Sequence, residues 1–279
     1  MRRPLRSVVR TAGRLTSGAR IRPSFLVVGA QRCGTTSLHR TLKQHPSIVG
    51  ASHKKGVHYF DVNYTRGDNW YQGHFPLRST ARRLSRRSGM PVVACESSPY
   101  YLFHPLAPER IARDLDGVRV VVMLRDPAER AYSAYTHERA RGFETEDLDR
   151  ALALEDERLA GEVDRIRADP GYVSHAHQHN AYVARGRYVE QLERFEALLG
   201  RERMHVVDCG DFFTDPAGVY ADVVAFLGLP PFPGVRHDQH NARPRTDLDD
   251  ATRRRLDAYF APYDERLATW LGRAPSWRR

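Results

Sequence analysis

The stretch that decides the fold is FLVVGAQRCGTTSLHRTLKQHP, residues 25–46. Its beginning, Phe25–Gly29, is a short apolar run that ends in glycine, which is typical of a buried strand. A glycine-containing turn follows, and Thr36–Gln44 is expected to be a helix. Such a turn gathers successive backbone N–H groups at the positive end of the helix dipole. The stretch therefore predicts an anion-binding loop between a strand and a helix.

The spacing of the loop, G-x4-G-T-T over Gly29–Thr36, is close to the phosphate-loop pattern G-x4-G-K-[ST]. The lysine that would reach a β/γ-phosphate is replaced by Thr35, and a positive residue, Arg32, lies inside the loop instead. We therefore do not expect an ordinary ATPase or kinase, although a P-loop nucleotide kinase stays an alternative. A glycine-containing turn without any ligand is the other interpretation of this stretch taken alone.

Apolar runs and helical stretches alternate along the rest of the chain. Further strands are expected at Pro91–Cys95, Val118–Leu124 and Met204–Asp208. Helices are expected from the N-cap Asp126-Pro127 to Arg141, at 146–168 as a charged surface element, and at Tyr182–Leu199, Pro216–Leu227 and Leu248–Leu271. This alternation predicts an α/β fold with a central parallel sheet flanked by helices on both faces. Ligands of such sheets bind at the carboxyl ends of the strands.

Length and composition exclude several classes of protein. The chain has 279 residues, of which 41% are hydrophobic and 28% are charged, so it can bury a core and is neither disordered nor fibrous. It contains no run of about 18 apolar residues, which argues against an integral membrane protein. Its cysteines, Cys33, Cys95 and Cys209, form neither a CxxC pair nor a disulfide framework. A reducing compartment, the cytoplasm, is therefore expected.

Positive charge is concentrated at the N-terminus. The first 22 residues hold seven arginines and no acid, so about +3 (10 − 7) of the net charge of +10 belongs to the remainder. We expect residues 1–22 to be a flexible basic arm without the apolar core of a secretory signal, and residues 23–279 to be a single domain. The arm could lie weakly on an anionic membrane surface, and no motif indicates a specific nucleic-acid partner. A second basic stretch, Arg78–Arg87, is expected to be a surface loop or a helix end; the oligomeric state stays open.

Two segments resemble sulfotransferases that use 3′-phosphoadenosine 5′-phosphosulfate (PAPS). Residues 25–46 resemble the family's 5′-phosphosulfate loop, in which a basic residue and a small residue precede Gly-Thr-Thr. VVVMLRDPAERAYSAYTH, residues 120–137, resembles its 3′-phosphate motif, a strand that ends in Arg-Asp-Pro with a serine eight residues after the arginine. These residues are Arg125 and Ser133 here, and an arginine fork with a nearby hydroxyl can bind one phosphate together.

Weaker similarities extend the resemblance over about residues 24–272. KKGVHYFD, residues 54–61, resembles a Glu-x-His-aromatic-Phe-Asp segment of heparan-type sulfotransferases, and Glu96–Pro99 resembles their Glu-Lys-Thr-Pro segment. Residues 240–272 resemble their C-terminal phosphate-covering loop and last helix, with Ala242 and Arg243 at the Gly-Arg positions of that loop.

The resemblance implies a P-loop-like sulfotransferase fold and a function. The chain would transfer a sulfuryl group from PAPS to a hydroxyl of a carbohydrate, glycan or glycosylated small molecule, with no metal. A homologue that binds PAPS, or its product adenosine 3′,5′-bisphosphate (PAP), without catalysis is the alternative. The residues implied in donor binding are Gln31, Arg32, Cys33, Gly34, Thr35, Thr36, Arg125, Ser133, Ala242 and Arg243.

The first departure from the family pattern concerns the residue that would protonate the leaving phosphate. The family usually has lysine where Arg32 stands. Arginine supplies charge and a hydrogen-bonding fork but is almost never deprotonated, so it is a poor acid. Lys54 or Lys55 could share this task, and we include Arg32 and Lys55 among the catalytic candidates.

The general base is a second departure. The glutamate that heparan-type relatives use as the base is replaced by Gly56, which we expect to widen the pocket for a bulky acceptor. His58 becomes the first candidate base, because an extended backbone at 57–60 would point positions 56 and 58 to the same side. Glu96 is the second candidate. A histidine that only packs against the pocket wall is the alternative for His58.

Several histidines are not assigned to a metal site. His175, His177 and His179 alternate in HAHQH, and His237 and His240 follow later. Zinc sites use such spacings, but no cysteine or carboxylate completes a ligand set. We expect the HAHQH stretch to be a loop near the mouth of the acceptor pocket.

Overall fold

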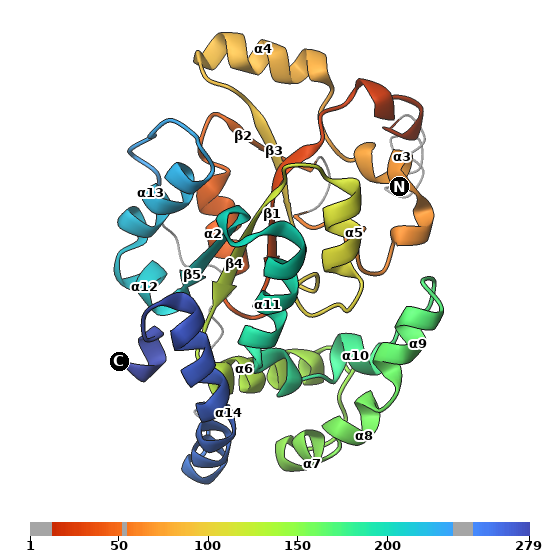
Figure 1. Ribbon diagram of the computed structural model, residues 1–279, viewed down its shortest axis with the longest axis vertical. Coiled ribbons are helices and arrows are strands. Elements are labelled where there is room, and N and C mark those ends of the chain that lie inside the picture. Colours follow the sequence, from red (N-terminus) through yellow and green to blue (C-terminus); the bar gives the residue numbers. More distant parts are fainter. Residues whose placement is uncertain (1–12, 52–54, 237–247) are drawn as a thin grey trace.

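The computed structural model describes residues 13–51, 55–236 and 248–279. Its centre is a five-stranded sheet with the strand order β2-β3-β1-β4-β5, in which all neighbouring strands are parallel (Figure 1). The strands are β1 Pro23–Gly29, β2 Ile48–Gly50, β3 Val93–Ser97, β4 Arg119–Leu124 and β5 Met204–Asp208. The expected α/β fold with a central parallel sheet is confirmed. The edge strand β2 was not expected, because three residues give too short an apolar pattern.

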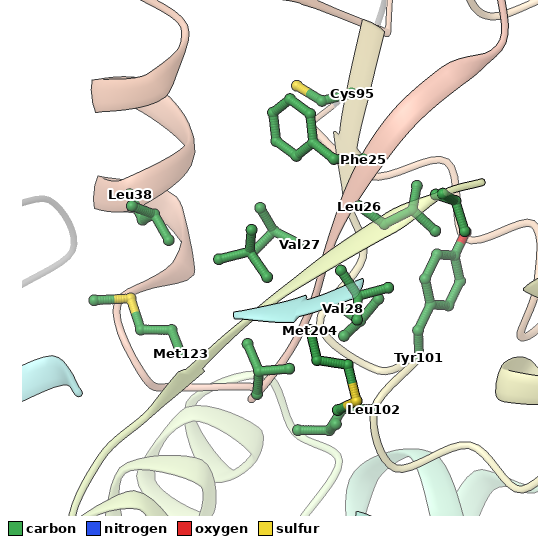
Figure 2. Close-up of a cluster of buried hydrophobic side chains, with 14 of the residues drawn as sticks. Phe25, Leu26, Val27, Val28, Leu38, Cys95, Tyr101, Leu102, Met123 and Met204 are labelled. Atoms are coloured by element: carbon green, nitrogen blue, oxygen red, sulfur yellow. The ribbon is translucent and has the colours of Figure 1, made fainter. Parts of the chain in front are cut away.

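The central strands are apolar along their whole length because helices cover both faces of the sheet. In β1 every residue except Ser24 is buried. Figure 2 shows Val27 on the side of Leu38, whereas Leu26 and Val28 point toward the side of Tyr101. Side chains of a strand alternate between faces, so a strand covered on both faces becomes a continuous apolar run.

The helices lie on both faces of the sheet, with α5 and α11 packed together on one face and α2 and α13 packed together on the other (Figure 1). The α-helices are α2 Thr35–Leu42, α3 Asp68–Gln72, α4 Arg78–Ser88, α5 Ala107–Asp114, α6 Pro127–Ala140, α7 Leu148–Ala153, α8 Glu155–Leu159, α9 Glu162–Ala168, α10 His175–His179, α11 Tyr188–Leu199, α12 Cys209–Thr214, α13 Pro216–Phe226 and α14 Asp250–Leu271. The 3-10 turns are η1 Ser17–Ala19, η2 Tyr64–Arg66, η3 Ala184–Gly186, η4 Arg201–Arg203 and η5 Ser276–Arg278. Helix α6 begins as expected, because the Asp126 carboxylate accepts hydrogen bonds from the backbone N–H groups of Ala128 and Glu129.

Residues 146–168 differ from the expected charged surface helix. They form the three short helices α7, α8 and α9. The first break follows Leu154, and the second falls at Gly161, whose φ of +70° ends a helical path. The side of these helices that faces the domain is buried. There the Glu155 carboxylate accepts hydrogen bonds from the backbone N–H groups of Tyr182, Val183 and Ala184. This carboxylate fixes the turn η3, so helix α11 begins at Tyr188 and not at the expected Tyr182.

The expectation of a flexible arm is wrong for residues 13–22, which pack on the domain. The Arg20 guanidinium donates to the carbonyl of Phe75, and the Gln72 amide donates to the carbonyl of Arg20 over 3.0 Å. Arg22 forms an ion pair with Asp68. Residues 1–12 of the expected arm lie outside the described residues. Within the described ranges, no helix is long and apolar enough to span a membrane.

Candidate active site

The loop between β1 and α2 lies at the carboxyl edge of the sheet. The Ala30 N–H donates to the Met123 carbonyl over 2.7 Å, which fixes the loop to β4. Gly34 caps α2 with a φ of +83°, and a Cβ there would lie 3.1 Å from the Cε of Met123. Arg32 also adopts a left-handed φ of +73°, which is uncommon outside glycine and is often found at functional sites. The sequence thus forms the tight turn that a phosphate loop requires.

Lys55 supplies the ammonium group that the loop lacks at Thr35. Its Nζ donates to Thr35 Oγ1 over 2.9 Å and to Thr36 Oγ1 over 3.1 Å. The segment is fixed beside β3, because the Ser97 N–H donates to the Lys55 carbonyl over 2.9 Å. Burial, together with the nearby charge of Arg40, lowers the pKa of Lys55 to about 7. A lysine with this pKa exchanges its proton near neutral pH.

The two resemblance motifs meet at the same edge of the sheet. Arg32 Nε in the loop donates to Ser133 Oγ on α6 over 3.2 Å. Arg125 follows the last residue of β4, and its guanidinium pairs with Glu129 over 2.9 Å. Arg253 of α14 approaches this pair, with 3.4 Å between its Nη1 and the Glu129 carboxylate. The residues expected to bind the two ends of the donor are therefore neighbours.

Cys33 faces away from the site. Its side chain is fully buried, and its Sγ lies 3.6 Å from the hydroxyl of Tyr188. Burial raises the pKa of the Cys33 thiol, and the positive charge of Arg130 opposes this shift only in part. The side chain belongs to the core, so Cys33 can contribute only its backbone to a ligand held by the loop.

His58 is paired with a buried carboxylate that the sequence analysis did not single out. Its Nδ1 lies 2.8 Å from Oδ2 of Asp61, whose side chain is buried, whereas the His58 side chain is 39% exposed. The other Asp61 oxygen accepts a hydrogen bond from the Val62 N–H over 2.6 Å. His58 has a φ of +56°, so the expected extended backbone at this position is wrong. The sequence did contain a signal for Asp61, because it is the last residue of KKGVHYFD, the segment that resembles Glu-x-His-aromatic-Phe-Asp.

Glu96 is enclosed and fully hydrogen-bonded. It is 0% exposed, and its two oxygens accept from the backbone N–H of Val57 (2.6 Å) and from three hydroxyl groups at 2.9 Å. These hydroxyls belong to Tyr71, Ser98 and Tyr101. Burial raises the pKa of Glu96, while the hydrogen bonds oppose that shift. This environment favours a structural role, in which Glu96 holds residues 55–58 against the end of β3.

Gly56 is required by a close approach of two backbones. A Cβ at this position would lie 2.5 Å from the Ser97 carbonyl oxygen and 2.7 Å from Ser98 Oγ. The space beside Gly56 is therefore filled by the end of β3. The expectation that Gly56 widens an acceptor pocket is wrong for this reason.

Arg185 is a site residue that the sequence analysis missed. It lies in η3, is 3% exposed, and donates through Nη1 to Gln31 Oε1 in the loop. Its Nη2 donates to two carbonyls at the end of α10, and its guanidinium lies 4.8 Å from the ring centre of Tyr100 and 5.0 Å from that of Phe103. Burial lowers the pKa of Arg185 to about 10. No sequence pattern signals this contact, because 154 positions separate Arg185 from Gln31.

Arg130 is a second buried cation near the loop. It is 0% exposed and donates through Nη2 to the carbonyl of Tyr182, while its Nε and Nη1 have no hydrogen-bond partner among the described residues. It lies within the second motif of the sequence, between Arg125 and Ser133, but on the buried side of α6. Arg130 and Arg185 add positive charge behind the loop, where no solvent screens it.

The HAHQH stretch is a packed helix, so the expected loop at a pocket mouth is wrong. In α10 the ring of His177 stacks on Phe103 at 4.3 Å, and its Nδ1 lies 2.7 Å from the Tyr100 hydroxyl. Burial lowers the pKa of His177 to about 2. His179 pairs with Glu138 over 3.0 Å. The described part of the chain contains no group of three or more His, Cys, Asp or Glu side chains that could hold a metal ion.

Some of the expected residues cannot be placed. Lys54, Ala242 and Arg243, together with His237 and His240, lie outside the described residues.

Comparisons with known proteins identify the family of the chain. The model of the sulfotransferase domain family matches residues 22–242. The crystal structure of a sulfotransferase from Alicyclobacillus acidocaldarius is similar over 93% of this chain and 100% of that one, with 32% identity and a TM-score of 0.68. A heparan sulfate glucosamine 3-O-sulfotransferase 5 from Mus musculus is 24% identical over 91% of this chain and 74% of its own length. The bifunctional heparan sulfate N-deacetylase/N-sulfotransferase 2 of Bos taurus is 27% identical over 92% of this chain, which spans 31% of that protein. Because the family model spans most of the chain, and the Alicyclobacillus protein is similar to it in both sequence and fold, the chain belongs to the sulfotransferase domain family.

Proposed function

We propose that this protein transfers the sulfuryl group of PAPS to a hydroxyl of a carbohydrate or glycosylated metabolite. The observation that supports it best is the pair of cation–hydroxyl contacts at the carboxyl edge of the sheet. Lys55 contacts the hydroxyls of Thr35 and Thr36, and Arg32 contacts that of Ser133. PAPS has two anionic ends, and these contacts bring the loop and Ser133, which we assign to different ends, to the same edge of the sheet. The carbohydrate acceptor is proposed because curated relatives are named for heparan sulfate.

Each end of the donor has its own set of residues in this proposal. Residues 31–36 and the Lys55 ammonium would hold the 5′-phosphosulfate, since they combine a helix N-terminus with a cation. Arg125 and Ser133 would hold the 3′-phosphate, for which the arginine exchanges its present pairing with Glu129. Ala242 and Arg243 stay proposed donor contacts on the basis of the resemblance alone.

The reaction forms a bond from the acceptor oxygen to sulfur and breaks the bond from sulfur to the bridging oxygen of the 5′-phosphate. Negative charge grows on that phosphate, so fixed cations beside it stabilise the transition state most. Arg32 supplies charge there. Lys55 can in addition donate a proton to the leaving oxygen, because its ammonium group lies at the hydroxyls of Thr35 and Thr36 in the loop.

His58 would accept the proton of the acceptor hydroxyl. With Nδ1–H donating to the Asp61 carboxylate, Nε2 is the ring nitrogen that can take up a proton, and the buried carboxylate stabilises the imidazolium that results. General bases of this kind contribute typically about 10²–10⁴-fold to a rate. Asp61 acts on the proton transfer only through His58 and is therefore a positioning residue.

The test is transfer of labelled sulfate from PAPS to a panel of carbohydrate acceptors, together with calorimetry of nucleotide binding. We expect transfer without added Mg²⁺, and PAP should bind far more tightly than AMP or ATP because it engages both anion sites. Equal affinity for AMP and PAP would contradict the proposal.

A non-catalytic homologue is the second candidate, because Gly56 replaces the carboxylate that heparan-type relatives use as the base. Tight PAP binding with no transfer to any acceptor would support it. Magnesium-dependent phosphate transfer from ATP would instead support the kinase alternative.

A further inference from the structure

Helix α4 is a strongly cationic element that plays no part in the proposed reaction. It contains five exposed arginines and no acid: Arg78, Arg82, Arg83, Arg86 and Arg87. At about 100° per residue, these positions cover roughly half of the helix circumference. The other half contains Ala81, Leu84 and two serines, and Ala81 is buried. The helix therefore rests on its small residues and presents an arginine surface outward.

This arginine surface is at the opposite end of the molecule from the candidate active site. Figure 1 shows α4 at one end of the long axis, whereas β4 points toward α6 near the other end. Since α4 leads into the first residue of β3, it adjoins the amino edge of the parallel sheet. The loop at Arg32 and the Ser133 hydroxyl lie at the carboxyl edge. A partner bound to α4 would therefore leave the active-site edge open to substrates.

The positive charge of this surface is not neutralised by the described part of the protein. None of the five arginines pairs with a described acidic side chain. Arg78 instead donates through Nε to the carbonyl of Arg20, which brings the basic segment 13–22 beside the helix. The sequence adds four arginines and no acid within residues 1–12.

We propose that α4 is a docking surface for an anionic membrane. Arginines spread over half of a helix at the end of a molecule can reach phosphates across a plane, and the sequence contains no nucleic-acid recognition motif. Each arginine at such a surface strengthens binding by roughly fivefold, and salt weakens this attraction because it screens exposed charges. The inference does not depend on the proposed reaction.

The test is sedimentation of the 279-residue protein with vesicles of phosphatidylcholine alone and of an equal mixture with phosphatidylglycerol. The variant Arg82→Gln/Arg83→Gln/Arg87→Gln removes three charges from α4. The matched control, Arg150→Gln/Arg167→Gln/Arg254→Gln, removes three exposed arginines elsewhere. We expect binding to the anionic vesicles only, a loss of about 100-fold in the α4 variant, and a change of no more than about threefold in the control.

A second measurement on the wild-type protein does not rely on variants. Residues 78–88 should gain hydrogen-exchange protection on anionic vesicles, and binding should weaken steeply as salt is added. Equal binding by the α4 variant and the wild type would overturn the proposal, and so would equal binding to neutral vesicles. Tighter binding to duplex DNA than to the anionic vesicles at the same salt would also overturn it, in favour of a nucleic-acid partner.

Discussion

Binding of PAP at the candidate donor site should depend on pH through the ammonium group of Lys55. Without a ligand its pKa is about 7, because burial removes its ammonium group from water. A bound phosphate would stabilise the charged form and raise this pKa. At about pH 8, PAP binding should therefore take up close to one proton. Calorimetry in two buffers of different ionisation enthalpy measures this number.

The variant Lys55→Met should bind PAP more weakly and take up almost no proton. Lys43→Met is the matched control, because Lys43 is exposed and Lys55 is the lysine that donates to the hydroxyls of Thr35 and Thr36. It should retain the uptake of the wild type. The same uptake in Lys55→Met would show that another group titrates.

His58 and Glu96 are distinguished by what their loss should change. His58→Ala should reduce turnover by about 10²-fold or more and leave PAP affinity nearly unchanged. Glu96→Gln should instead lower the free energy of unfolding by roughly 1–3 kcal/mol, because four hydrogen-bond donors surround the Glu96 carboxylate in the wild-type protein. Near-normal turnover in His58→Ala would rule out its role as the base.

At the residue scale, the sequence predicted what neighbouring positions determine. Arg32 and Thr35 in the loop and Arg125 and Ser133 after β4 do lie at the same edge of the sheet, as order and spacing indicated. Contacts between distant positions could not be predicted in this way. Arg185 reaches the loop only because Glu155 shapes the turn η3, and neither residue belongs to a local pattern.

Gly56 controls the position of the segment that contains Lys55 and His58. Gly56→Ala places a Cβ 2.5 Å from a backbone carbonyl, so the segment must move away from the end of β3. We expect a lower melting temperature, weaker PAP binding and slower turnover, measured by calorimetry and by the transfer assay. Gly18→Ala is the control, because no atom lies within 4 Å of a Cβ built there.

Gly56→Glu has the same steric conflict, so restoring the family's carboxylate should not raise the rate. A faster Gly56→Glu enzyme would show that the two backbones can separate without disturbing Lys55, and that the site lacks a base.

At the element scale, buried strands were the most predictable part of the chain. The strand at Met204–Asp208 has the expected bounds, and β1 and β4 differ by one or two residues. The region 146–199 was the least predictable, because the turn at Gly161 and the buried Glu155 carboxylate, and not a hydrophobic period, decide where its helices begin and end. Glu155 accepts three backbone N–H groups of the turn that precedes α11, and a glutamate in a charged stretch gives no sign of such a role.

At the scale of the whole molecule, the two ends of the sheet have different tasks in our proposals. The carboxyl edge holds the residues proposed for donor binding and catalysis, and the amino edge adjoins the arginine surface of α4. The parallel topology brings this about, because all strands end at the same edge and the connections return to the other. A docked protein could therefore keep its active-site edge accessible.

The folded domain begins before residue 23, because residues 13–22 pack on it. Their removal would leave the Gln72 side chain without its acceptor, the Arg20 carbonyl, and would leave the Pro76 carbonyl without the Ile21 N–H at 3.0 Å. It would also remove the hydrogen bond of 2.9 Å from the Ser17 hydroxyl to Asn69.

A chain that begins at residue 23 should therefore melt roughly 5 °C or more below one that begins at residue 13, because each lost hydrogen bond costs about 1 kcal/mol or more and each kcal/mol corresponds to about 2–4 °C at this size. Differential scanning calorimetry of the two chains beside the 279-residue protein measures this difference. PAP affinity serves as the control: it should be equal in the two chains at low temperature, since the lost contacts lie away from the loop. Equal melting temperatures would show that the domain begins at residue 23, as the sequence had suggested.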